Sequence, residues 1–398
     1  MAAGSVSGNE LSRRMREDGG GRPSSAHGPW RDESRCWLAV PKQSSGMSLQ
    51  GARCPACFTV VVQNTPCACG YDPGAPVSPL ILPPGALLRA EGGQGEYRIG
   101  LVLGAGGFGV TYLGWHPGRN ERVAIKEYLP RDRVGRATNG VTVRPHTTQD
   151  AALFQHGLAC FLQEAETLSQ FKHPNIVRVL EFFRANETAY LVMPYYEGKT
   201  LGQHLGELGE RSKSEPWVTP RLSSEVAVDV MLGVLDGLSH VHKRTMDGKR
   251  WMHRDVKPEN ILLRRDGGAL LIDFGAARAE VGELSKSLSV VLTPGYAPPE
   301  QYFPGGKTQG PWVDVYGCAA TLYHALTGEA PVGALERYDA VRRGERDPLR
   351  RPDLVVPSLA PALSEVLVQG RYCQEVCKRD QAAAFDFSSR LTFLRPST

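Results

Sequence analysis

Two acidic side chains and one amide are spaced in this sequence as a nucleotide-bound metal ion would require. Residues 253–260 read HRDVKPEN, so Asp255 is followed five residues later by Asn260. Asp273 follows Asp255 by eighteen positions and begins the tripeptide DFG. Phosphoryl transfer needs a carboxylate that accepts a hydroxyl proton, together with oxygen ligands for Mg²⁺. The two motifs together, in this order, favour that chemistry over a pair of chance turns.

A glycine-rich segment precedes these residues. Gly104, Gly106 and Gly109 form the pattern G-x-G-x-x-G between two strand-like segments. Glycine lets backbone N–H groups approach phosphates without obstruction from a Cβ atom. A dinucleotide-binding loop requires a helix directly after the glycines, whereas a second strand follows here. The pattern therefore favours a hairpin that covers phosphates, and a plain tight hairpin is the alternative.

A lysine in an apolar strand is the next candidate. Lys126 ends the run VAIK, and a buried lysine is costly unless it is paired. We expect it to hold the α- and β-phosphates, the alternative being an edge lysine that reaches solvent. Residues 151–172 have helical apolar spacing, and Glu164 shares the face of Phe161, whereas Glu166 points elsewhere. Glu164 is therefore the predicted acidic partner of this lysine.

These motifs together resemble the protein kinase superfamily, from Tyr97 to about Gly370. More narrowly, five segments resemble a bacterial subfamily of serine/threonine kinases: GFGVTYLG, VAIKEYLP, HPNIVRV, LIDFGAAR and PGYAPPEQY. The resemblance implies ATP as the phosphoryl donor, Mg²⁺ or Mn²⁺ as the metal, and protein Ser/Thr hydroxyls as acceptors. It also implies autophosphorylation and a role in bacterial signalling.

The same resemblance implies a role for each site residue. Asp255 would be the catalytic base, Lys257 would stabilise the transferred phosphoryl group, and Thr293 would bridge these two. Asn260 and Asp273 would ligate Mg²⁺, and Lys126 and Glu164 would form the ion pair of the other lobe. The implied nucleotide-binding residues are Gly104, Ala105, Gly106, Gly107, Phe108, Gly109, Ala124, Lys126, Met193, Tyr196, Asn260 and Asp273.

Two further positions and one departure follow from the resemblance. Glu300, in PPE, stands where the family usually has Ala-Pro-Glu, and Asp314 matches a buried aspartate that braces the catalytic loop. After Gly370 the chain lacks the usual Arg-Pro ending of the last helices. The arginine partner of Glu300 is therefore left open, with Arg379 a poor candidate.

Three serines are candidate regulatory phosphosites. Arg254, next to the predicted base, would await an anion from the activation segment. Ser285, Ser287 and Ser289 lie in that segment. A polar loop without regulation is the equally weighted alternative.

The order of predicted elements gives an α+β fold, in which strands come first and helices later. We expect a bilobal protein kinase fold with a β-rich N-lobe and a helical C-lobe, preceded by a small four-cysteine element like a zinc ribbon. Its strands are expected over 97–115, 121–130, 189–196, 261–263 and 270–272, and its helices over 151–172, 223–242 and 311–328. The predicted boundaries are 1–53 for a disordered segment, 54–72 for the four-cysteine element, 73–96 for a Pro-rich linker, and 97–395 for the kinase domain, divided into lobes 97–194 and 195–395.

Four of the nine cysteines cluster near the N-terminus, as Cys54-x2-Cys57 and Cys67-x-Cys69. Four thiolates could hold a tetrahedral Zn²⁺, although the second pair is one residue tighter than the usual spacing. Free thiols in a disordered tail and a redox pair are the alternatives. No histidine or acidic residue completes a hydrolytic site, so a structural metal is predicted.

Composition excludes several function classes. A formal net charge of +4 over 398 residues gives little support for binding to nucleic acid or an anionic membrane through bulk electrostatic attraction. No apolar stretch approaches the roughly 20 residues of a membrane span. The odd number of cysteines and the lack of an apolar leader predict a cytoplasmic protein. The oligomeric state is left open.

Two rival functions stay open. A kinase-fold enzyme acting on a small molecule would lack the Lys257 pattern and the PGY…PPE segment, both of which are present. A pseudokinase scaffold would lose catalytic residues, which are intact here, but the unusual C-terminus keeps this alternative in view.

Overall fold

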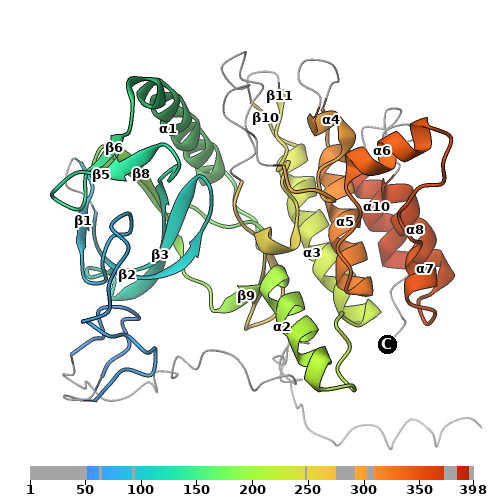
Figure 1. Ribbon diagram of the computed structural model, residues 1–398, viewed down its shortest axis with the longest axis horizontal. Coiled ribbons are helices and arrows are strands. Elements are labelled where there is room, and N and C mark those ends of the chain that lie inside the picture. The colour runs from blue at the N-terminus through green and yellow to red at the C-terminus, as the bar shows by residue number, and fades with distance from the viewer. Residues whose placement is uncertain are drawn as a thin grey trace, which may run out of the picture.

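The first half of the protein forms an antiparallel sheet of six strands, in the order β1-β2-β3-β4-β8-β7 (Figure 1). The computed structural model describes residues 52–61, 65–91, 95–246, 249–274, 292–302, 309–371 and 383–393. The six strands are β1 (Leu87–Arg89), β2 (Glu96–Ala105), β3 (Gly109–His116), β4 (Glu121–Tyr128), β7 (Glu181–Ala185) and β8 (Thr188–Pro194). The predicted hairpin and the two predicted strands of this lobe are confirmed.

The sheet begins earlier than the predicted lobe boundary. Strand β1 lies inside the segment 73–96 that the sequence marks as linker, and Leu88 pairs with Tyr97 of β2. Leu88 is buried in the main core. A strand of three residues in a Pro-rich segment is too short to give a recognisable sequence pattern. Strand β1 is therefore identified only by its pairing with β2.

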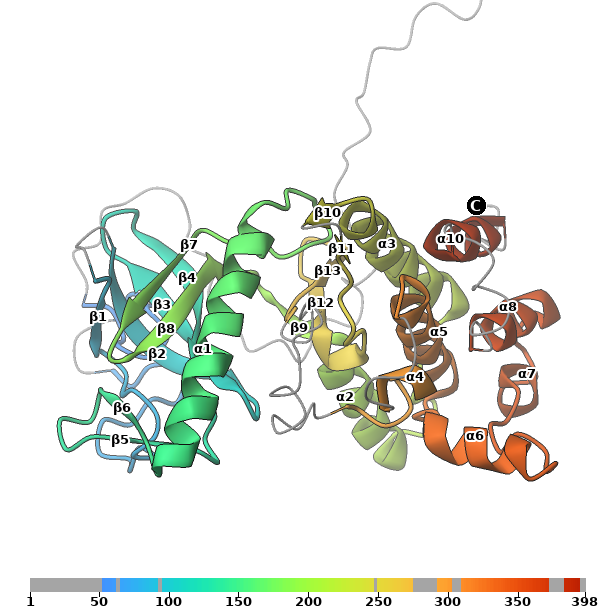
Figure 2. The same ribbon diagram turned by 90° about the horizontal axis from the view of Figure 1, so that it is seen from above.

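Helix α1 (Thr148–Ser169) packs beside the sheet and carries the predicted Glu164 (Figure 2). Its buried face includes Phe154 and Phe161, whose rings lie 5.4 and 5.7 Å from the ring of Tyr128 at the end of β4. The helix begins with Thr147, whose side chain accepts a hydrogen bond from the backbone N–H of Asp150. Between β4 and α1 the chain forms an additional hairpin, β5 (Val134–Arg136) and β6 (Val143–Pro145).

The second half is helical and follows a short connection after Pro194. Its helices are α2 (Leu201–Ser214), α3 (Ser224–His242), α4 (Pro299–Tyr302), α5 (Trp312–Thr327), α6 (Ala334–Arg342), α7 (Pro352–Val355), α8 (Pro361–Arg371) and α10 (Ala383–Phe393). The predicted helices over 223–242 and 311–328 are confirmed. Helix α3 begins after Ser223, which caps it, and α5 ends at Gly328 in a left-handed conformation.

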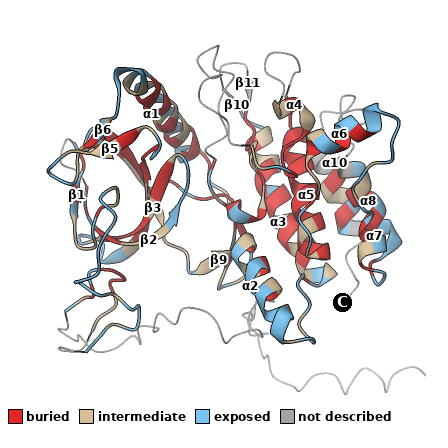
Figure 3. Ribbon diagram, viewed as in Figure 1, coloured by how far each residue is buried: buried red, intermediate tan, exposed pale blue. Residues whose placement is uncertain are grey.

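Helices α3 and α5 form the centre of this lobe. Almost every residue of α5 is buried, which explains its continuous apolar sequence (Figure 3). Helices α8 and α10 pack against α5 and α3. The two lobes lie side by side and share one continuous hydrophobic core.

Short strands position the segments that carry Asn260 and Asp273. Strands β9 (Gly198–Thr200), β12 (Ile261–Arg264) and β13 (Ala269–Leu271) form a small antiparallel sheet in the order β13-β12-β9. A 3₁₀ turn over Pro258–Asn260 leads into β12, and β10 (Thr245–Met246) pairs with β11 (Lys249–Arg250). Within the described ranges, no helix has both the length and the apolar character needed to cross a bilayer.

Candidate active site

The catalytic loop is held by a buried aspartate at the start of α5. Asp314 accepts hydrogen bonds from the backbone N–H of His253 at 2.9 Å and of Arg254 at 2.6 Å. The Nε2 atom of His242 lies 2.7 Å from the same carboxylate. Burial alone would raise the pKa of Asp314, but the hydrogen bond and charge of His242 and the backbone donors hold it below its usual value. Arg254 adopts a positive φ of 66°, a strained conformation that these contacts stabilise.

Four residues of the predicted site contact one another in and next to this loop: Asp255, Lys257, Asn260 and Thr293. The Lys257 ammonium lies 2.8 Å from Oδ2 of Asp255 and donates to the Thr293 hydroxyl at 2.9 Å. The side-chain nitrogen of Asn260 donates to both Oδ2 and the backbone carbonyl of Asp255, at 2.8 Å each. These bonds use the nitrogen of the Asn260 amide, so its oxygen is the atom that could ligate a cation.

Asp273 follows β13 and turns toward the other lobe. Its φ is 59°, and its Oδ1 lies 2.5 Å from the Lys126 ammonium. The next residue, Phe274, is buried, and its ring meets that of His253 edge-on at 4.4 Å. The backbone N–H of Ile272 bonds to the carbonyl of Asn260 at 2.9 Å. The two predicted Mg²⁺ ligands therefore come from neighbouring segments of one small sheet. Gly275, the last residue of DFG, lies outside the described residues.

Lys126 projects from β4 toward this carboxylate group. Burial would lower the pKa of Lys126, but the Asp273 and Glu164 carboxylates together raise it above its usual value. Glu164 is half-buried on α1, whereas Glu166 is exposed, which agrees with the helical phase used to choose between them. The direct 2.5 Å contact with Asp273 could not be read from the sequence, because 147 positions separate the two residues.

Three of the residues expected around the nucleotide, Ala124, Lys126 and Met193, share one face of the sheet. Register places Leu113, Ala124 and Met193 opposite one another in β3, β4 and β8, and Lys126 lies on the same face two positions after Ala124. The glycine-rich loop joins β2 and β3. There Gly104, Ala105, Gly106 and Gly107 are exposed, whereas Phe108 and Tyr196 are half-buried.

Two contacts of the glycine-rich loop are absent from the sequence interpretation. A Cβ atom on Gly109 would lie 2.3 Å from the carbonyl oxygen of Glu127, so a larger residue would separate β3 from β4. The Arg131 guanidinium donates to the carbonyl of Gly106 at 3.2 Å. Arg131 lies shortly after the end of β4. The sequence carries no signal for its contact with Gly106, because the contact depends on the turn that brings the chain back to the loop.

The segment after Thr293 is anchored in the helical lobe. Glu300 is buried and accepts a hydrogen bond from the Trp312 indole at 2.9 Å. Gln301 donates to the carbonyl of Arg254 at 2.9 Å. The sequence interpretation did not identify Trp312 as a partner of Glu300. Arg379 and the candidate phosphosites Ser285, Ser287 and Ser289 lie outside the described residues.

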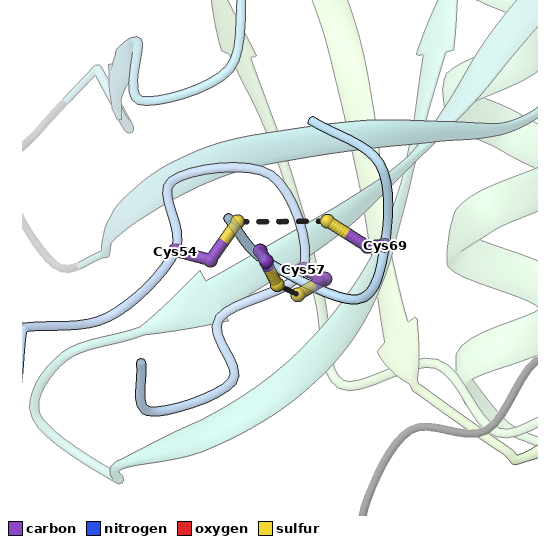
Figure 4. A group of neighbouring side chains, drawn as sticks. Cys54, Cys57 and Cys69 are labelled. Atoms are coloured by element: carbon purple, nitrogen blue, oxygen red, sulfur yellow. Dashed lines mark hydrogen bonds between the residues drawn. The ribbon is translucent and has the colours of Figure 1, made fainter. Parts of the chain in front are cut away.

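The four clustered cysteines converge beside strands β2 and β3 (Figure 4). Their sulfur atoms all lie within 4.8 Å of one another; Cys54 and Cys69 are 3.6 Å apart, and Cys57 and Cys67 are 3.4 Å apart. A tetrahedral ion with Zn–S bonds of about 2.3 Å would separate its sulfurs by about 3.8 Å. The donor set and spacing therefore fit such an ion. Cys54 and Cys57 are buried, so the alternative of thiols in a disordered tail does not hold for them.

Comparison with known proteins agrees with this geometry. The family "Protein kinase domain" matches residues 97–355. The chain is 28% identical to serine/threonine-protein kinase Pkn1 of Myxococcus xanthus, over 69% of this chain and 35% of Pkn1. It is 32% identical to serine/threonine-protein kinase PkaA of Streptomyces coelicolor, over 68% of this chain and 46% of PkaA. The chain thus spans less than half the length of these curated relatives.

A solved structure described as "PpkA-294 apo form" is also similar. It superimposes with a TM-score of 0.61 at 28% identity, over 78% of this chain and 99% of that chain. The expected bilobal fold is therefore confirmed. Together with the family match, these findings show that the chain belongs to the protein kinase family.

Proposed function

We propose that the protein is a serine/threonine protein kinase that transfers the γ-phosphoryl group of ATP to hydroxyl groups of protein substrates. The observation that carries the proposal is the position of the Lys257 ammonium, between Oδ2 of Asp255 at 2.8 Å and the Thr293 hydroxyl at 2.9 Å. A cation beside the base and next to the substrate-facing segment serves phosphoryl transfer to a hydroxyl. Residues 97–395 are the proposed catalytic domain.

In this mechanism Asp255 orients the acceptor hydroxyl and accepts its proton. Lys257 balances negative charge on the phosphoryl group as it moves, and Thr293 holds the lysine in place. Lys126, oriented by the carboxylates that raise its pKa, holds the α- and β-phosphates. Asn260 and Asp273 would hold Mg²⁺ or Mn²⁺, whose positive charge would offset the negative charge of the phosphates.

The decisive experiment compares the wild-type protein with Asp255→Asn. We expect the wild type to transfer label from γ-labelled ATP to a generic protein acceptor and to itself. The variant should lose about 10²- to 10⁴-fold in rate while its affinity for ATP is kept. Labelling of a metabolite alone would favour a small-molecule phosphotransferase, and normal nucleotide binding without any turnover in the wild type would favour a pseudokinase.

Control through the activation segment is proposed from sequence alone, because Ser285, Ser287 and Ser289 are candidates by position. A phosphopeptide map of active enzyme in which none of the three is modified would refute it. The odd number of cysteines, nine, supports a reducing compartment such as the cytoplasm.

We also propose that Cys54, Cys57, Cys67 and Cys69 bind one structural Zn²⁺. Support comes from four sulfur atoms within 4.8 Å of one another, on two segments that the metal would join. Metal analysis of the purified full chain should find one zinc per molecule. Its absence, with four free thiols by titration, would refute this site without affecting the kinase proposal.

A further inference from the structure

The Cys element, defined here as residues 52–61 and 65–71, packs against the sheet. Cys54, Cys57 and Phe58 form a buried cluster with Leu113 and Trp115 of β3. The half-buried hydrophobic residues around this cluster are Val61, Cys67, Tyr71, Leu101, Leu103 and Tyr195. Three of them matter for the nucleotide: Leu101 and Leu103 lie in β2 just before Gly104, and Tyr195 follows the last residue of β8.

Strand register identifies which face of the sheet the Cys element covers. Leu113 is opposite Ala124, and Ala124 is opposite Met193. Residues opposite one another, and residues two apart in one strand, point to the same face. Lys126 therefore shares its face with Leu113. The Cys element thus contacts the face that carries the nucleotide lysine, beside the strand that enters the glycine-rich loop.

Polar contacts fix the position of the Cys element on this face. The backbone N–H of Leu101 donates to the carbonyl of Ala56 at 2.9 Å. Arg122 of β4 donates to the carbonyl of Cys57 at 3.0 Å and to the hydroxyl of Thr59 at 2.9 Å.

The Cys element lies so close to β2 that no side chain larger than that of glycine fits at Gly100. A Cβ atom on Gly100 would lie 2.3 Å from the carbonyl oxygen of Ala56 and 2.7 Å from the ring of Phe58. The Cys element therefore lies directly against the backbone of β2, not merely near it.

The backbone hydrogen bonds described for this element lie within one part or the other, as from Cys54 N–H to the Thr59 carbonyl and from Gly70 N–H to the Cys67 carbonyl. The two parts meet at the sulfur cluster and at the apolar contacts of Cys67 and Tyr71. A segment this small cannot fold on its own apolar burial, and such segments depend on a metal or another cross-link. A metal held by both cysteine pairs would fix the surface that Phe58 and its neighbours present to the sheet.

We propose that occupancy of the cysteine site by Zn²⁺ controls the affinity of the kinase for ATP. The metal holds the Cys element against Leu101 and Leu103, which precede the glycine-rich loop, and against the cluster that Tyr195 joins. Without metal the element loosens, and the loop and the connection between the lobes lose a rigid support. The inference rests on the proposed zinc site and on ATP binding by the proposed kinase.

The test measures binding of a non-hydrolysable ATP analogue to the full-length protein by calorimetry. Zinc-loaded protein is compared with protein stripped by a thiol-selective chelator and with the double variant Cys57→Ser/Cys67→Ser. We expect the dissociation constant to rise about tenfold without metal, within the usual range of coupling between two sites. Restored affinity after Zn²⁺ is returned to the stripped wild type shows that the protein remained folded. Cys160→Ser, in α1 and outside the cluster, is the thiol control and should bind as the wild type does.

Two further readouts separate coupling from simple damage. Coupling is reciprocal, so the nucleotide analogue should raise the affinity for Zn²⁺ by the same factor in a competition titration with a chelator. Phe58→Ala keeps all four thiols but removes the contact with the sheet, so it should bind zinc and yet show weakened nucleotide binding.

Each failure has a distinct meaning. Equal nucleotide affinity with and without bound zinc would overturn the coupling and leave the zinc site and the kinase intact. A chain that takes up no zinc would overturn both the site and the coupling. Loss of turnover with unchanged coupling would instead count against the proposed kinase activity alone.

Discussion

The Glu127 carboxylate accepts a hydrogen bond from the Arg136 guanidinium at 2.6 Å, with side-chain exposures of only 0% and 2%. The hydroxyls of Tyr112 and Tyr190 donate to the same carboxylate at 2.9 and 2.7 Å. Arg136 also donates to the carbonyl of Leu80, in the segment before the sheet, at 2.9 Å. Glu127 directly follows Lys126, so this network joins the additional hairpin and the N-terminal segment to the strand that carries the nucleotide lysine.

Replacing one partner of this buried pair should destabilise the N-lobe. Arg136→Met leaves Glu127 charged and buried without its main partner, which costs about 3–5 kcal/mol in the free energy of unfolding. The double variant Arg136→Met/Glu127→Gln should lose less than Arg136→Met alone, because no uncompensated charge is left. Urea unfolding measures both. Arg343→Met, which removes an exposed pair with Glu345, is the matched control and should leave the midpoint unchanged. A double variant that loses as much stability as Arg136→Met, or more, would contradict the coupled network.

The hydroxyl of Thr293 should matter for turnover more than for stability. Thr293→Val removes the acceptor that holds the Lys257 ammonium, and a hydrogen bond to a charged group contributes roughly 1.5–3 kcal/mol. We expect kcat to fall about tenfold or more in steady-state assays, with the dissociation constant for ATP unchanged. Thr293→Ser retains the hydroxyl and should keep most of the activity. Equal losses in both variants would contradict the hydroxyl as the critical group, because Thr293→Ser retains it.

The Asp314 brace can be tested by removing its charge. Asp314→Asn keeps one acceptor oxygen but turns an amide NH₂ toward a backbone donor, so the N–H of His253 or of Arg254 loses its bond. An unsatisfied buried donor costs about 1–3 kcal/mol, and kcat should fall because the position of Asp255 loosens. Thermal unfolding and single-turnover kinetics measure the two effects. His242→Asn removes only the side-chain partner of Asp314 and should reduce kcat less. A reduction as large as that of Asp314→Asn would show that the backbone contacts are not the main way in which Asp314 supports the loop.

Stability should decline as the solution becomes mildly acidic. Burial lowers the pKa of His253 below the usual value of about 6.5, so the folded protein keeps this ring neutral where the unfolded chain is protonated. The unfolded state then binds more protons, and the free energy of unfolding falls as the pH drops below about 6.5. Each such histidine contributes at most about 1.4 kcal/mol per pH unit.

Urea unfolding between pH 7.5 and about pH 5 measures this dependence. His253→Phe keeps an aromatic ring against Phe274 but cannot titrate, so its stability should change less over the same range. His324 and His240, whose pKa values burial also lowers, stay in both proteins and contribute to the residual slope. An identical slope in the variant and the wild type would mean that His253 is not the group responsible.

Much of the catalytic centre was readable from the sequence because its parts are contiguous. The loop from His253 to Asn260 carries its own short-range geometry, and Asp273 follows β13, which pairs with β12, the strand before it in the chain. Helical phase separated Glu164 from Glu166, since one face of α1 must be buried. Residues whose positions depend on local order or on periodicity were therefore predictable.

Contacts between distant segments were decided only by the tertiary structure. The pairings of Lys126 with Asp273, of Glu127 with Arg136 inside the core, and of Glu300 with the Trp312 indole depend on how separate elements meet. The sequence by itself determined the motifs, the order of the elements and the cluster of four cysteines. That those cysteines lie against the face of the sheet that carries Lys126 followed only from packing, because an apolar surface in β2 and β3 does not specify which segment will cover it.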